Sequence, residues 1–122
     1  VPYAELAVLM ARADVCLGIF GDNARAKLVV TNKVVEAIGM AKPIITRRNE
    51  PVQELLTHRE SVYLVDPASP RALADAILEL KNQPELRHSI ARKGYEVFQA
   101  NCTLPQLGKG LEQVIRNVLR RA

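Results

Sequence analysis

The sequence predicts an α/β fold: a small three-stranded parallel sheet with about six helices around it. Three short apolar runs, rich in β-branched residues, have the length and composition of buried strands. Segments with apolar residues at helical spacing separate these runs. Strands that alternate with helices are joined by crossovers, and such crossovers produce parallel pairing. We expect residues 1–122 to form a single unit, since this length is typical of one domain.

The first helix and strand lie at the start of the chain. Leu6, Met10 and Ala13 occupy one stripe of a helix predicted over residues 3–13. The run VCLGIF at residues 15–20 is continuous and apolar, which is typical of a strand buried on both faces.

A second helix is predicted after the polar loop 21–27. Thr31 offers an N-cap for this helix. Its apolar stripe consists of Val34, Ala37, Ile38 and Ala41. Pro43 marks its end, and the run PIIT at residues 43–46 is predicted as the second buried strand.

The third strand is predicted at residues 62–65, where the sequence reads VYLV. Before it, Asn49 and Pro51 form a cap and first-turn pair that predicts a short helix. After it, the pair Ser69–Pro70 repeats this signal and opens a helix to about residue 82. The buried stripe of that helix is expected to contain Leu73, Ile77 and Leu80.

Two further helices complete the chain. Pro84 begins the first, whose expected contacts are Leu86, Ile90, Val97 and Phe98. Thr103 caps the second, which has the clearest periodicity in the sequence. Its apolar stripe contains Leu107, Leu111, Val114, Ile115, Val118 and Leu119. We expect this stripe to be packed and to cover part of the sheet.

The composition excludes several classes of protein. No apolar run is long enough for a membrane span, and no signal peptide is visible, so we expect a cytoplasmic protein. The formal net charge of +4 is spread along the chain, and aromatic residues make up only 4%. The doublets Arg47–Arg48 and Arg120–Arg121 are interpreted as solvated surface, and no nucleic-acid partner is expected. Cys16 and Cys102 show no disulfide or metal spacing, so we expect reduced thiols and no metal.

The start of the second helix is the candidate site. Ligands of open parallel sheets bind beyond the carboxyl ends of the strands, and this helix follows the first strand. Asn32, Lys33 and Glu36 share the face opposite the apolar stripe. The helix N-terminus and Lys33 would suit a phosphate, and Glu36 would suit the hydroxyls of a ribose. On spacing alone, a solvent-facing first turn with a stabilising acid is the simpler interpretation.

A family resemblance favours the binding site. The segment ADVCLGIFG…NKVVEAIGMAKPIIT at residues 13–46 resembles the C-terminal domain of GT-B-type glycosyltransferases, in the large retaining family 4. The resemblance continues through Glu54-Leu55-Leu56 and VYLVDP at 62–67, and covers most of the chain. It implies a Rossmann-like fold that binds a nucleotide-diphosphate sugar, with hexosyl transfer to an acceptor and no further cofactor.

The resemblance also implies roles for single residues. Glu36 matches the second glutamate of the family's Glu-(seven residues)-Glu motif, which holds the ribose, and Asn32 and Lys33 match residues near the diphosphate. The first glutamate of the motif is replaced by Leu28. The loop resembles instead a Gly-Asp-x-x-x-x-Lys branch, so we expect Asp22 or Lys27 to approach the sugar or the phosphates.

Other departures concern the loops and the extent of the chain. Ala41 stands where glycine is common, and the loop 47–50 lacks the small residues often found there. The family's C-terminal domain begins with three further β-α units, and an N-terminal domain binds the acceptor. We therefore expect a partial domain that is inactive alone, from a parent that is cytoplasmic or peripheral on the inner membrane face. The strand at 15–20 would then be an open edge that favours self-association.

Two alternatives remain open at this point. One is a nucleotide- or phosphate-binding module without catalysis. The other is a flavodoxin-like receiver domain, for which Asp66 follows the third strand but the required acidic pair is absent. His58 and His88 lack partners spaced for a triad or a metal site, and we interpret both as surface residues. No catalytic residue is assigned.

Overall fold

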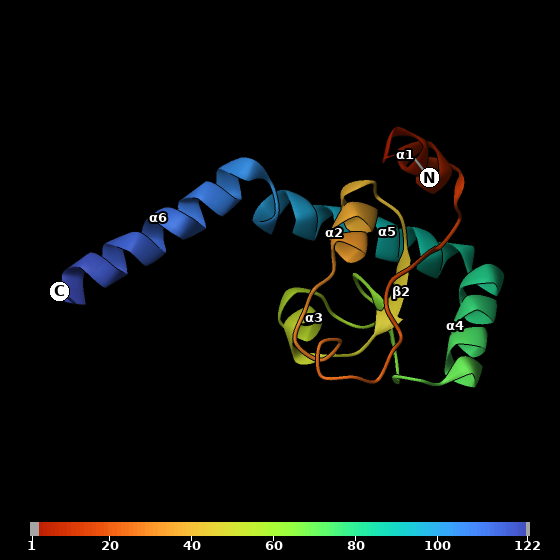
Figure 1. The fold of residues 1–122 in the computed structure, drawn as a ribbon. Coiled ribbons are helices and arrows are strands. Elements are labelled where there is room, and N and C mark those ends of the chain that lie inside the picture. The colour runs from red at the N-terminus through yellow and green to blue at the C-terminus, as the bar shows by residue number, and fades with distance from the viewer. Residues whose placement is uncertain (1–2, 122) are drawn as a thin grey trace.

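The computed structural model describes residues 3–121, and it contains every strand and helix that the sequence predicts (Figure 1). The side chains of Leu6 and four other residues near the two ends lie outside this description. In chain order the elements are α1 (Tyr3–Arg12), β1 (Cys16–Leu17), α2 (Asn32–Gly39), β2 (Ile44–Arg47), α3 (Glu50–Leu55), β3 (Tyr63–Val65), α4 (Pro70–Asn82), α5 (Pro84–Asn101) and α6 (Leu104–Arg121).

The three strands form one parallel sheet in the order β1-β2-β3, as predicted. β1 is shorter than the predicted strand at 15–20, and a side-chain contact follows its last residues. The Ile19 N–H donates to Thr46 Oγ1 at 3.2 Å. Gly18 permits this contact, because a Cβ there would lie 2.4 Å from the same oxygen. Past this point the Arg47 N–H still donates to the Ile19 carbonyl at 2.9 Å, so the chain runs beside β2 to the predicted end.

The core has two clusters of buried side chains, one on each face of the sheet. Ile44 of β2 belongs to the cluster under α2 and α3, whereas Ile45 belongs to the cluster under α4. All four residues of β2 are buried, as expected for a central strand. Gly94 brings α5 against α2, since a Cβ there would lie 3.1 Å from the Ile38 side chain.

The predicted N-cap residues differ in whether their side chains make the capping hydrogen bond. The side chains of Asn49 and Ser69 accept hydrogen bonds from Val52 N–H and Ala72 N–H, as the cap-then-proline signal predicted. Thr31 occupies the N-cap position of α2, but its hydroxyl makes no capping bond and is buried without a partner among the described residues. The expected capping bond at this position is therefore wrong.

Two expectations about helix faces are also wrong. Ala41 is not part of the α2 stripe, because α2 ends at Gly39 and Ala41 is left-handed with φ 55°. Glycine adopts that conformation without strain, which gives a reason for the family's glycine there. On α4 the buried positions are Ala76 and Leu80, while Ile77 is 38% exposed.

Helix α6 departs most from expectation. The helix projects away from the sheet and from the other helices (Figure 1). The six stripe residues predicted to be packed are instead exposed, from 50% at Ile115 to 68% at Leu119. The amphipathic pattern was read correctly, but no described part of the chain lies where it could cover the stripe.

Candidate functional site

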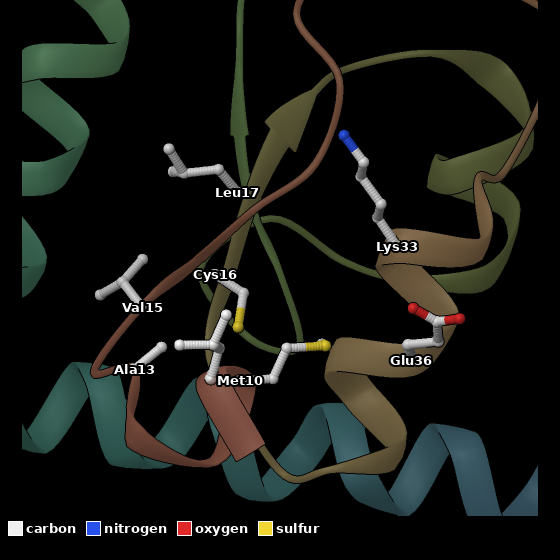
Figure 2. Close-up of a pocket in the computed structure, with 8 residues that line it drawn as sticks. Met10, Ala13, Val15, Cys16, Leu17, Lys33 and Glu36 are labelled. Carbon is white, nitrogen blue, oxygen red and sulfur yellow. The ribbon is translucent and has the colours of Figure 1, made fainter. Parts of the chain in front are cut away.

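Two hollows lie on either side of Lys33, at the N-terminal end of α2. The first is an apolar pocket of about 300 Å³ between α1, β1 and α2 (Figure 2). The second is a polar pocket of about 480 Å³ between the segment after β1 and the start of α2. Lys33 lines both pockets. The two pockets therefore share one cationic side chain, that of Lys33.

The apolar pocket is formed by the end of α1 and by the strand that follows it. Met10 and Cys16 lie at its floor, and Glu36 projects from α2 beside Lys33 (Figure 2). Lys42, which follows α2, is bonded to the end of α1: its Nζ donates to the Ala11 carbonyl at 2.9 Å. Burial raises the pKa of the Cys16 thiol, although nearby Lys42 acts to lower it. The thiol therefore stays protonated and adds to the apolar lining.

The second pocket is called the polar pocket here because polar and charged residues enter its lining, although apolar residues such as Phe20 and Val29 line it too. It begins at Gly18 and Gly21 on the segment after β1 and includes Asn23, Arg25 and Thr31. Thr31 belongs to this lining, although its hydroxyl oxygen is itself buried. The first turn of α2 begins directly after Thr31, and its Val34 N–H donates to the Thr31 carbonyl at 3.1 Å, which leaves the N–H groups of Asn32 and Lys33 for other acceptors. Such a surface suits an anion with several oxygens.

The loop between β1 and α2 is held by side chains from the turn after β2. Arg47 donates from its side chain to the Gly21 carbonyl at 2.8 Å. Asn49 donates to the carbonyls of Ala26 and Val29, both at 2.9 Å. Both side chains are buried, at 5% and 7% exposure. The shape of the polar pocket therefore depends on residues outside its lining.

The structure separates the residues that the sequence selected. Lys33 and Glu36 line the apolar pocket, and Asp22 lies on the Gly21 turn, 3.8 Å from the Arg47 guanidinium. Asn32 and Lys27 are exposed and line neither pocket. Their roles in binding a donor stay predictions.

Sequence reasoning missed the polar residues that follow β2. Arg47 was interpreted as part of a solvated basic doublet, and that interpretation is wrong for Arg47 because its side chain is buried. Arg48 fits it, with a 46% exposed side chain that pairs with Asp66 at 3.0 Å. The run Thr46-Arg47-Arg48-Asn49 could have indicated this burial. In it, polar residues continue directly from a buried strand, where the family often has small residues.

The histidines and the acidic residues indicate no second centre of chemistry. His58 is partly buried, and its Nδ1 accepts from the Leu64 N–H at 2.9 Å, which corrects its interpretation as a simple surface residue. His88 is exposed, as expected. Over residues 3–121, no group of His, Cys, Asp and Glu side chains is placed to hold a metal ion. The same range contains no helix long and apolar enough to span a bilayer.

Solved structures similar to this chain include a sucrose-phosphate synthase, HepE and a domain of a group 1 glycosyl transferase. A sucrose-phosphate synthase from Thermosynechococcus elongatus superposes with a TM-score of 0.77 at 22% identity, covering 100% of this chain and 29% of that one. HepE from Anabaena, in complex with UDP-glucose, gives 0.76 at 18% identity, with 89% and 29% covered. The C-terminal domain of a group 1 glycosyl transferase (LpcC) from Francisella tularensis gives 0.68 at 21%, with 84% and 50% covered. At these identities the likeness establishes the fold, and the chain spans between about a third and a half of these proteins.

The sequence comparison goes further than the fold. No curated protein gives a significant sequence match. However, residues 1–109 match the family described as glycosyl transferase-like. Because that match covers most of the chain, the protein belongs to the glycosyl transferase-like family.

Proposed function

We propose that this chain is the donor-binding part of a retaining, family 4 glycosyltransferase of the GT-B type. One observation carries the proposal: an apolar pocket and a polar pocket meet at Lys33, beside the N-terminus of α2. A nucleotide-diphosphate sugar has the same sequence of chemistry, with an aromatic base, a ribose, two phosphates and a polar sugar.

The nucleoside would occupy the apolar pocket. Met10 and Leu17 provide flat apolar surface for a base, and Glu36 lies where a carboxylate can accept hydrogen bonds from the ribose hydroxyls. The negative charge of Glu36 repels a phosphate, so the diphosphate would lie away from Glu36 and the ribose would lie next to it.

The diphosphate would lie at Lys33 and the first turn of α2, with Asn32 and the Thr31 hydroxyl nearby. The sugar would then reach the Gly21–Asp22 turn, with Lys27 on the same loop. Sugar transfer requires stabilisation of the departing diphosphate, which positive groups and helix N-termini supply without covalent chemistry. The proposal assigns no metal and no cofactor other than the donor.

The acceptor would be bound by a separate N-terminal domain. The solved relatives are two to more than three times as long as the region that superposes, which leaves room for such a domain and for further β-α units. We propose that residues 1–122 form a partial C-terminal domain, and that transfer needs the complete parent. The free thiols Cys16 and Cys102 support a cytoplasmic location, including the inner membrane face for the parent.

A non-catalytic nucleotide-binding module is the second candidate. The same two pockets favour it, since they provide binding surface for a nucleotide whether or not sugar transfer follows. The receiver-type alternative has lost its support, because residues 1–109 match the glycosyl transferase-like family.

Titration calorimetry with UDP-glucose and with GDP tests the proposal on this chain. We expect saturable heat with one of the two, and loss of most of the affinity in Glu36→Ala. The matched control is Glu96→Ala, an exposed glutamate on α5. In the complete parent, Glu36→Ala should abolish transfer. Near-normal turnover of that variant would overturn the assignment of Glu36, and heat with the nucleotides but no turnover of the unmodified parent would favour the non-catalytic module.

A further inference from the structure

We propose that Arg47 is a positioning residue for the sugar-phosphate end of the donor. Its side chain fixes the Gly21–Asp22 turn at the rim of the polar pocket, and so sets the affinity for the diphosphate and sugar without touching the nucleoside. The inference rests on the proposed function, and it concerns a residue outside both pocket linings.

Burial is the first argument. Arg47 is 5% exposed, and a buried guanidinium is destabilising unless its N–H groups find acceptors. Its Nε donates to the Arg48 carbonyl at 3.0 Å, and Nη1 donates to the Gly21 carbonyl at 2.8 Å. The Asp22 carboxylate, 3.8 Å from the same Nη1, supplies a compensating charge. The guanidinium therefore has a fixed orientation and is not a solvated surface cation.

Arg47, the last residue of β2, contacts the segment that follows β1. Its backbone N–H donates to Ile19, in the segment after β1, at 2.9 Å. Its side chain reaches Gly21 two residues later. Two bonds from one residue define where the chain leaves the sheet edge, at the glycine that lines the polar pocket.

The far end of the same loop has its own anchor. Asn49 holds Ala26 and Val29, so residues 21–29 are attached at both ends to the turn between β2 and α3. Asn49 also caps α3, and removing it would disturb a helix. The side-chain hydrogen bonds of Arg47 reach only the loop and its own turn, which makes Arg47 the cleaner point of perturbation.

Arg48 is a natural control. It has the same side chain at the next position, but it is 46% exposed and pairs with Asp66 at the surface. Substituting either arginine removes the same charge from the same edge of the sheet. Only substitution of Arg47 releases the Gly21 carbonyl.

The experiment compares Arg47→Met, Arg48→Met and Arg47→Lys with the unmodified chain, by calorimetry and by amide hydrogen exchange. We expect Arg47→Met to weaken UDP-glucose about tenfold while UMP binding is nearly unchanged, because one hydrogen-bonded charge is lost at the sugar end only. Amides of residues 21–29 should exchange faster, and those of α5 should not. Arg48→Met should leave both measurements unchanged, and Arg47→Lys should fall between.

Each outcome decides between the two proposals. Equal losses for UMP and UDP-glucose, or unchanged exchange over residues 21–29, would overturn the role of Arg47. If the unmodified chain binds neither nucleotide, the proposed function fails for this chain, and the exchange measurement still decides whether Arg47 holds the loop. If Arg47→Met does not fold, Arg47→Lys carries the comparison, since it keeps the charge but cannot make both donated bonds.

Discussion

In the β2–α3 turn, counted here from the last residue of β2, Arg47 and Asn49 are buried, whereas α6 exposes leucines such as Leu107 and Leu111 to solvent. The turn makes five side-chain hydrogen bonds within the domain, counting three from Asn49 and two from Arg47. The helix makes its side-chain hydrogen bonds to itself, as in the pair Gln113–Asn117. Burial in this protein therefore follows the position of partners more closely than the polarity of the residue.

A pair of glycine substitutions gives the largest contrast between these regions. Gly18→Ala places a Cβ 2.4 Å from Thr46 Oγ1 and 2.6 Å from Thr46 Cβ, inside the sheet. We expect it to lower the free energy of unfolding by about 3 kcal/mol, since neither strand can move without breaking ladder bonds. In α6, Gly108→Ala meets nothing within 4 Å and should raise helix stability by up to about 1 kcal/mol.

Urea unfolding followed by circular dichroism measures both glycine variants. A loss in Gly108→Ala comparable to that in Gly18→Ala would show that α6 is packed in solution, which would remove the contrast with the turn.

Removal of a buried amide gives the next effect. Asn49→Ala loses the cap of α3 and leaves the carbonyls of Ala26 and Val29 without their donor. We expect a loss of about 2 kcal/mol in the free energy of unfolding. Asn117→Ala, which removes an exposed amide of α6, is the matched control and should change it by less than about 0.5 kcal/mol. Equal effects in the two variants would contradict the structural role of Asn49.

The same contrast explains what could be predicted from the sequence. Strands β2 and β3 and the helices opened by Asn49–Pro51 and Ser69–Pro70 depend on neighbouring residues, and local patterns were enough to place them. The burial of Arg47 depends on the Gly21 carbonyl, which is 26 residues away, so a local pattern indicates only a basic doublet.

The candidate site divides in the same way. Lys33 and Glu36 were found because helical spacing places them on one face of α2. Thr31 was taken as a capping residue, and only the packed structure shows its hydroxyl without a partner beside the polar pocket. The exposed stripe of α6 could not be anticipated, since an amphipathic pattern does not identify what covers it.

The open edge of β1 and the apolar stripe of α6 are the two exposed surfaces compared for self-association. Among residues 3–121, β1 pairs with β2 alone, and Leu17 on this edge is 45% exposed. We expect the chain to associate through this edge, as open strands do. In light scattering at high concentration, Leu17→Lys should lower the apparent mass and Leu111→Lys should not. If only Leu111→Lys lowers the apparent mass, the contact between copies lies on α6. If the unmodified chain is monomeric, neither surface mediates self-association.

The smallest expected effect concerns His58, a polar side chain turned inward like those of the β2–α3 turn. Burial, followed by the charges of Arg48 and Arg59, lowers the pKa of His58 below its ordinary value of 6.5, against the opposing effect of Glu79. The neutral ring is the form that accepts from Leu64 N–H, and a proton on Nδ1 would remove that bond. The stabilising contribution is therefore complete above pH 6.5 and declines as the pH falls toward the lower pKa of the folded state.

The measurement is the free energy of unfolding at pH 7.5 and pH 5.5 for the unmodified chain, His58→Gln and His88→Gln. We expect His58→Gln to flatten this pH dependence and His88→Gln to leave it intact, because His88 is exposed in both states. Equal slopes in all three proteins would mean that the bond to Leu64 contributes nothing, and that burial near β3 does not distinguish His58 from a surface residue.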